Sequence, residues 1–148
     1  MELAQIGATA KGGVRRLALT DLDRQGRDLV VGWLRDAGAD IEVDGAGNVF
    51  ATRAGANSMA PTVLTGSHVD TQPSGGKFDG NYGVLAGLEV LRTLKDAGIV
   101  TEHPVGVAIW TNEEGSRFVP VMGGSGAFAG VFPLEHLLKQ RDVDGIAF

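Results

Sequence analysis

Two stretches of the chain repeat apolar residues at the spacing of three and four that is typical of an amphipathic helix. The first begins after Thr20, which fits a helix N-cap followed three residues later by an acid, and it ends before Gly38. The second covers residues 81–97, where a stripe of valine and leucine is followed by basic residues and then by Gly98. These patterns predict two long helices, each with one apolar face.

Four shorter segments have the pattern of β-strands. Residues 41–44 alternate between apolar and polar like a half-buried strand, and a Gly-Ala-Gly-Asn turn leads to a returning strand at 49–53. Residues 63–65 predict a short, buried strand. The continuous apolar run at 105–110 predicts a strand that is buried on both faces.

The order of these elements predicts an α/β protein with a mixed β-sheet flanked by helices, and further short helical segments are expected around Ala127 and over 134–140. In such sheets, ligands bind beyond the carboxyl ends of strands. His68 follows one predicted strand end, and Glu113 with Glu114 follow another. We therefore expect these side chains to lie on one side of the sheet.

Composition narrows the class of protein. The 148 residues are 43% apolar and 21% charged, which is the range of a folded globular domain. The sequence has no apolar run of about 18 residues and its first six residues lack the pattern of an export signal, so we expect no membrane span and a cytoplasmic protein. A net charge of −5 without a basic patch argues against nucleic-acid binding. Cysteine is absent, which excludes disulfides and sulfur-ligated metals within these residues.

Three short motifs carry the candidate chemistry. His68 and Asp70 lie in Gly-Ser-His-Val-Asp-Thr, Asp79 lies in Lys-Phe-Asp-Gly, and Glu113 and Glu114 lie in Thr-Asn-Glu-Glu-Gly. Together they supply one imidazole and several carboxylates, the ligand set of hard or borderline divalent cations. A metal lowers the pKa of bound water towards about 7, so that a neighbouring glutamate can accept its proton. The motifs thus predict metal-assisted hydrolysis.

Each of these residues also has a purely structural interpretation. His68 can cap a strand end, and Asp70 can either accept the second ring N–H of His68 or form an Asx turn. Asp79 stands directly before the second helix, and taken alone it is best interpreted as the N-cap. An isolated pair such as Glu113 and Glu114 is most often solvated on the surface. The joint occurrence of all three motifs favours the metal site.

Other polar residues are weaker candidates. His103 lies in a predicted loop beside a proline and His136 lies in a polar helix, so both are predicted to be surface residues rather than metal ligands. Arg15, Arg16 and Arg117 each have the charge to bind a substrate carboxylate, and a solvated role is at least as well supported for each of them.

The motifs at residues 66–71, 76–80, 83–88 and 111–118 together resemble those of the hydantoinase/carbamoylase amidases. These amidases are a branch of the M20 metallopeptidase-like hydrolases and include N-carbamoyl-L-amino acid hydrolases, β-ureidopropionases and allantoate amidohydrolases. The His-x-Asp motif and the Glu-Glu pair are typical of M20 broadly, whereas the continuation Glu-Glu-Gly-Ser-Arg-Phe is more specific to the carbamoylase branch. The resemblance extends over nearly the whole chain.

The resemblance implies a binuclear metal site and a role for each residue. His68 would bind one ion, Asp79 would bridge the two ions, and Glu114 would bind the other. Glu113 would be the general base, and Asp70 would orient His68. The ions would be zinc or manganese, with cobalt or nickel also suited to nitrogen and oxygen ligands. The expected reaction is hydrolysis of the carbamoyl (ureido) C–N bond of a small N-carbamoyl or ureido acid.

The resemblance also implies that residues 1–148 are the N-terminal part of an M20-type, zinc-exopeptidase-like catalytic domain. The family has two further ligand histidines downstream and an inserted lid domain that dimerises, and we expect these to lie outside the 148 residues. The full-length protein is then expected to be a homodimer, and the isolated chain to be a catalytically silent fragment that binds metal weakly. The alternative enzyme is an M20 peptidase or N-acyl amino acid deacylase, against which the Ser-Arg-Phe continuation argues.

Overall fold

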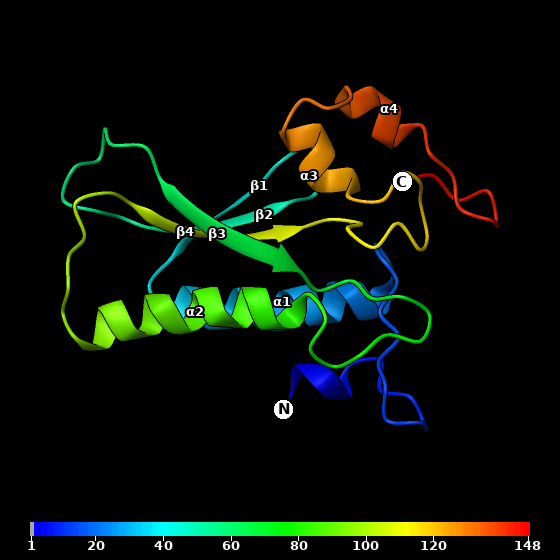
Figure 1. Cartoon of the computed structure of the whole chain (residues 1–148), viewed down its shortest axis with the longest axis horizontal. Helices are drawn as coiled ribbons and strands as arrows, with labels where there is room; N and C mark the ends of the chain where they lie inside the picture. Colours follow the sequence, from blue (N-terminus) through cyan, green and yellow to red (C-terminus); the bar gives the residue numbers. More distant parts are fainter. Residues whose placement is uncertain (1) are drawn as a thin grey trace.

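A computed structural model describes residues 2–148, and Met1 lies outside the described residues. Along the chain the elements are η1 (Leu3–Gln5), α1 (Asp21–Asp36), β1 (Asp40–Val43), β2 (Val49–Arg53), β3 (Val63–His68), α2 (Asn81–Asp96), β4 (Val105–Trp110), α3 (Gly123–Phe128) and α4 (Leu134–Leu138). Helices α1 and α2 lie against one face of the sheet, and α3 and α4 lie on the opposite side at one end (Figure 1). The predicted α/β class with a mixed sheet is confirmed.

Helix α1 begins and ends where the sequence predicts. The Thr20 hydroxyl accepts the Asp23 N–H at 3.3 Å, and the Asp23 carboxylate accepts the Leu19 N–H at 2.8 Å. This reciprocal cap satisfies main-chain donors that the first turn leaves free. After the helix, Gly38 has a φ of 86°, a conformation that glycine adopts without strain. In residues 2–148, no helix is both long enough and apolar enough to cross a membrane.

The sheet has the strand order β1-β2-β4-β3. The pairs β1–β2 and β2–β4 are antiparallel, whereas β3 and β4 run parallel with His68 opposite Trp110. Parallel strands bring their carboxyl ends to the same edge of a sheet. The loops that follow β3 and β4 therefore leave the sheet side by side, as the sequence predicts.

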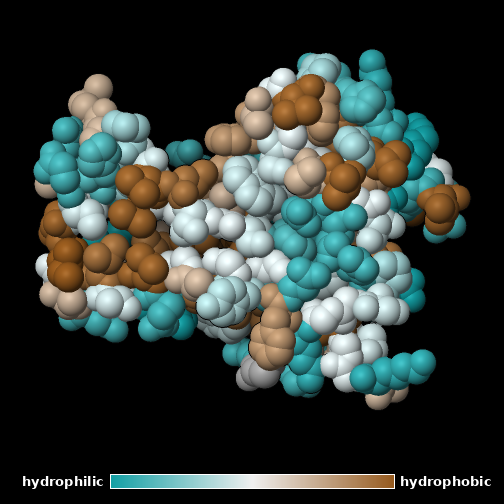
Figure 2. All heavy atoms as spheres, viewed as in Figure 1, coloured by the Kyte–Doolittle hydropathy of each residue, from teal (hydrophilic) through white to brown (hydrophobic). Residues whose placement is uncertain are grey.

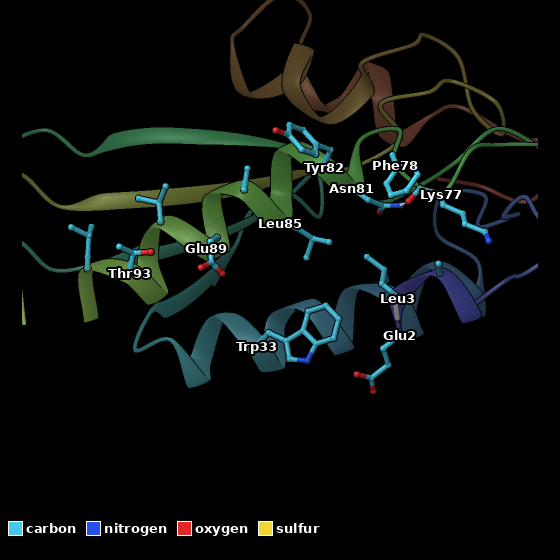
Figure 3. A pocket seen from close by; sticks show the side chains of 14 residues that line it. Glu2, Leu3, Trp33, Lys77, Phe78, Asn81, Tyr82, Leu85, Glu89 and Thr93 are labelled. Atoms are coloured by element: carbon cyan, nitrogen blue, oxygen red, sulfur yellow. Dashed lines mark hydrogen bonds between the residues drawn. The ribbon is translucent and has the colours of Figure 1, made fainter. Parts of the chain in front are cut away.

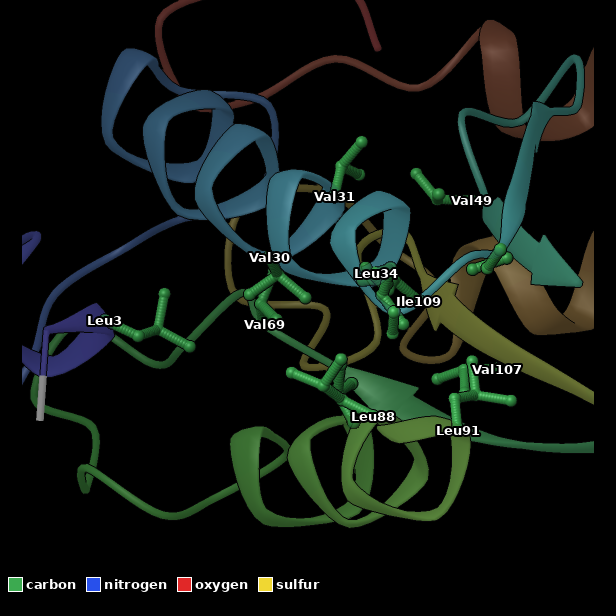
Figure 4. Close-up of a cluster of buried hydrophobic side chains, with 14 residues drawn as sticks. Leu3, Val30, Val31, Leu34, Val49, Val69, Leu88, Leu91, Val107 and Ile109 are labelled. Carbon is green, nitrogen blue, oxygen red and sulfur yellow. The ribbon is translucent and has the colours of Figure 1, made fainter. Parts of the chain in front are cut away.

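The core lies between the two long helices and the sheet (Figure 4). Strand β4 is buried along most of its length, as its apolar run predicts, and its Val107 and Ile109 are fully buried. They pack within one cluster with Leu34 of α1 and Leu91 of α2, both also fully buried. Removing such side chains from water is the main favourable contribution to folding, and here it fixes β4, whose end leads to Glu113 and Glu114, in the core.

The prediction for residues 63–65 is wrong in length and in burial. Strand β3 extends to His68, and Val63 and Leu64 are 59% and 39% exposed. The reason is that β3 lies at the edge of the sheet, where β4 is the strand that pairs with it in the described part of the chain. Figure 2 shows hydrophobic side chains on this side of the molecule, around the start of β3 and the end of α2.

Candidate metal centre

Three of the predicted site residues meet beside the carboxyl ends of β3 and β4. His68 is the last residue of β3, Glu114 lies in the loop after β4, and Asp79 directly precedes the N-cap of α2. One potential ligand atom from each side chain lies within 4.8 Å of the other two. Within residues 2–148, His103 and His136 are not part of this group.

His68 is held with one ring nitrogen directed at the group. Its side chain is buried, and Nδ1 donates to the main-chain oxygen of Asp70 at 2.8 Å. Because a carbonyl only accepts hydrogen bonds, Nδ1 donates its proton there, which leaves Nε2 as the ring nitrogen available to a ligand. The Asp70 carboxylate is 3.7 Å from Nδ1. Asp70 therefore orients His68 through its carbonyl, and the predicted orientation by its carboxylate is corrected.

The carboxylate of Asp70 instead connects the two loops. It is 1% exposed and accepts the main-chain N–H groups of Glu113 and Glu114, each at 3.3 Å. Burial raises the pKa of Asp70 to about 6, and the negative charge of Asp23 adds to this rise. The charge of His68 and the two N–H hydrogen bonds act in the opposite direction and lower the pKa. The Asx-turn interpretation is wrong, because the acceptor reaches the other loop rather than its own.

The loop that carries Asp79 is in contact with His68. Gly80 is the N-cap of α2 with a φ of 66°, and a Cβ placed there would lie 2.5 Å from the Cε1 and Nε2 atoms of His68. Only glycine satisfies both conditions without strain. No side chain caps α2, so the interpretation of Asp79 as the N-cap is wrong. The Asp79 side chain is exposed, so its carboxylate is accessible to a metal ion.

The two adjacent glutamates have different surroundings. Glu113 Oε2 lies 3.2 Å from His68 Nε2, and its side chain is 30% exposed. Glu114 Oε2 accepts a hydrogen bond from Gln72 at 3.1 Å, whereas Glu114 Oε1 is buried without a hydrogen-bond partner. A buried carboxylate oxygen without a partner is costly unless something positive occupies the site. This atom fits a metal ligand, and the pair is not a solvated surface pair.

Residues that the sequence analysis missed hold the loop after β4 in place. Asn112 is fully buried and donates to the main-chain oxygens of Phe118 and Pro120 at 2.8 and 3.2 Å. The Thr111 N–H donates to Asn48 at 3.0 Å. Nothing in the spacing of Asn48 or Asn112 distinguishes a loop anchor from a ligand, so the sequence carried no signal for either role.

Two of the three candidate arginines are neither solvated nor available to a substrate. Arg16 is fully buried among main-chain carbonyls. Arg117 donates to the main-chain oxygens of Ala18 and Leu19 and to the carboxylate of Asp142. Arg15 is exposed and remains a candidate for binding a carboxylate.

A large groove lies between α1 and α2 on the helical side of the molecule (Figure 3). Its walls are mostly apolar and include Trp33, Phe78 and Leu85. None of the three side chains of the candidate metal centre lines it. The groove is therefore not formed by the candidate metal ligands.

A mixed α/β sheet with an imidazole and carboxylates gathered beyond its strand ends is typical of metal-dependent hydrolases. A family model described as peptidase family M20/M25/M40 matches residues 64–147. An N-carbamoyl-L-amino-acid amidohydrolase of Rhizobium meliloti is 51% identical over 148 residues, which are 100% of this chain and 36% of that relative. An allantoate amidohydrolase of Bacillus subtilis is 38% identical over 98% of this chain and 35% of its own length.

Solved structures agree with this match. The crystal structure of a hydantoinase/carbamoylase family amidase from Burkholderia vietnamiensis superposes with a TM-score of 0.98 at 65% identity, covering 99% of this chain and 36% of that one. The chain belongs to peptidase family M20/M25/M40, in its hydantoinase/carbamoylase amidase branch. It spans about 36% of the length of the Rhizobium meliloti relative and of the Burkholderia vietnamiensis amidase.

Proposed function

We propose that this chain forms part of a metal-dependent amidohydrolase that cleaves the carbamoyl (ureido) C–N bond of N-carbamoyl-L-amino acids or related ureido acids, such as β-ureidopropionate and allantoate. The observation that carries this proposal is the meeting of His68, Asp79 and Glu114, of which Glu114 has a buried carboxylate oxygen without a hydrogen-bond partner. The names of the relatives from Rhizobium meliloti and Bacillus subtilis support the substrate class.

The proposed metal ligands are His68 through Nε2, Asp79 and Glu114. The family resemblance suggests that Asp79 would be the residue that holds both ions. Zinc or manganese fits this set of nitrogen and oxygen donors, and cobalt or nickel is also suited to it. When bound, such ions would polarise the scissile carbonyl and make water more acidic.

Glu113 is the proposed general base. Its Oε2 is 3.2 Å from the His68 nitrogen proposed to bind metal, and its partial exposure leaves it open to water and substrate. It would accept the proton of the attacking water at Oε2 and pass it to the leaving nitrogen. Asp70 positions Glu113 for this step, because its carboxylate accepts a hydrogen bond from the main-chain N–H of Glu113.

The proposal is tested by comparing two proteins in the same assay. One is the isolated chain, and the other is a chimera in which residues 1–148 replace the matching segment of the Burkholderia vietnamiensis amidase. We expect the chimera to release ammonia from N-carbamoyl-L-amino acids in a metal-dependent manner. The isolated chain should bind Zn²⁺ or Mn²⁺ weakly in calorimetric titrations and release little ammonia, since three ligands are too few for two ions.

Two results would contradict this account. Tight binding of two ions by the isolated chain, with rapid turnover, would show that the three side chains are not the limiting ligand set. Cleavage of dipeptides or N-acyl amino acids by the chimera, without ammonia release, would favour the M20 peptidase or deacylase alternative. The lid domain and the homodimer stay predictions from the family resemblance.

A further inference from the structure

Arg16 precedes α1 and is the bulkiest of the fully buried side chains among the described residues. Its guanidinium donates to neutral acceptors. Nε donates to the Val69 oxygen at 3.0 Å, one terminal nitrogen donates to the Leu3 and Ile6 oxygens at 3.2 and 2.9 Å, and the other donates to the Asn81 side chain at 3.1 Å. Burying a charged group in this way is costly, so a specific arrangement of acceptors must compensate for it.

Two acceptors of Arg16 lie at the two ends of the loop between β3 and α2, the loop that carries Asp79. Val69 lies between His68 and Asp70 in the sequence. Asn81 is buried, donates from its side chain to the Lys77 oxygen at 3.0 Å, and donates its N–H to the Asp79 oxygen at 2.6 Å. One guanidinium thus joins the main chain beside His68 to the main chain that carries Asp79.

We infer that Arg16 is a positioning residue that sets the distance between His68 and Asp79, and so the geometry of the metal centre. This inference rests on the proposed function, because it takes these side chains to be metal ligands. Arg16 touches neither of their ligand atoms, and it acts through Val69 and Asn81.

The contacts of Arg16 indicate a geometric role rather than neutralisation of charge. Among residues 2–148 it forms no ion pair, and the nearby buried Asp23 is paired with Arg27 at 3.1 Å. The Asp70 carboxylate binds main-chain N–H groups of the other loop. A planar guanidinium donates in several fixed directions at once, which a lysine ammonium cannot reproduce.

Helix α1 leaves room for this side chain at one position. Gly26 is buried in the helix, and a Cβ there would lie 2.9 Å from Arg16 Cδ and 3.1 Å from Nε. At Gly26, unlike at Gly32 of the same helix, an added Cβ would meet another residue, which gives this glycine a packing reason. The close approach of the guanidinium supplies that reason.

Gly26→Ala therefore displaces Arg16 without removing any hydrogen-bonding group. Gly32→Ala is the matched control, because Gly32 lies in the same helix with nothing within 4 Å of its Cβ position. Both variants and the wild-type chain are titrated with Co²⁺, whose visible absorption reports affinity and ligand geometry. We expect Gly26→Ala to bind Co²⁺ about 10-fold more weakly with an altered spectrum. Gly32→Ala should keep affinity and spectrum, and its unfolding midpoint should rise by roughly 2–4 °C.

Arg16→Lys keeps the positive charge and loses the fork of donors, so it provides a second test if Gly26→Ala folds poorly. We expect the same loss of affinity and the same spectral change. Cooperatively folded Gly26→Ala or Arg16→Lys chains with wild-type affinity and spectrum would overturn the inference alone. A wild-type chain that binds no Co²⁺ up to millimolar concentration would overturn the metal centre itself, and the inference with it.

Discussion

Replacing Glu113 by glutamine in the chimera is expected to lower kcat by about 10²–10⁴-fold, the usual contribution of a general base. Metal affinity should remain within about twofold, because the proposed ligands are other side chains and the amide keeps the shape of the carboxylate. The measurements are ammonia release from an N-carbamoyl-L-amino acid and calorimetric titration with Zn²⁺. The matched control is Glu102→Gln, an exposed glutamate at the opposite end of the sheet, which should leave both values unchanged.

Comparing the change in kcat with the change in metal affinity decides the role of Glu113. Its Oε2 is close to His68 Nε2, so a role as an additional ligand is the competing explanation. A ligand would lose metal affinity and activity together, whereas a base loses activity alone. Parallel loss of both, or unchanged turnover, would refute the assignment of Glu113 as the base.

Gly80→Ala is expected to abolish most metal binding by the chain and to lower its thermal stability. A Cβ at this position would lie 2.5 Å from the His68 ring and 2.5 Å from the His68 main-chain oxygen, so His68 must shift relative to Asp79 and Glu114. We expect Co²⁺ affinity to fall by about 10²-fold or more, because residues that orient a metal ligand contribute up to about this much to metal affinity. Titration of the variant and the wild-type chain under identical conditions measures this loss.

Gly98→Ala separates this displacement from backbone strain. Gly98 follows α2 with a φ of 64°, close to the 66° of Gly80, and nothing lies within 4 Å of its Cβ position. Both substitutions carry a backbone strain of about 1 kcal/mol, and Gly80→Ala adds the contacts with His68, so it should lower thermal stability more than Gly98→Ala does. Equal Co²⁺ affinity in the two variants would show that the contact of His68 with Gly80 does not matter for the centre.

The hydrophobic pattern was sufficient to predict the elements that position the site. The apolar run of β4 identified a strand buried on both faces, and the stripe of α2 identified the helix that covers it. The rule that ligands gather beyond the carboxyl ends of strands then brought His68 and the two glutamates together. The spacing of apolar residues is a local property of the sequence, which explains why these elements could be predicted.

Polar partners at long sequence separation could not be predicted in this way. Arg16 contacts Val69 across 53 residues, and Asp70 contacts Glu113 across 43 residues. Periodicity indicates which face of an element is buried, but not which acceptor a buried charge finds there. For the same reason the exposure of β3 was missed, since its neighbours in the sheet depend on topology rather than on its own residues.

The most direct test of the metal centre is a crystal of the chain soaked in Zn²⁺ and measured at the zinc absorption edge. An anomalous peak should lie about 2.0–2.2 Å from His68 Nε2 and from carboxylate oxygens of Asp79 and Glu114. The oxygen of Glu114 that is buried without a partner should be among these ligands. Zinc bound at other side chains, with these three atoms left without metal at saturating Zn²⁺, would contradict the account.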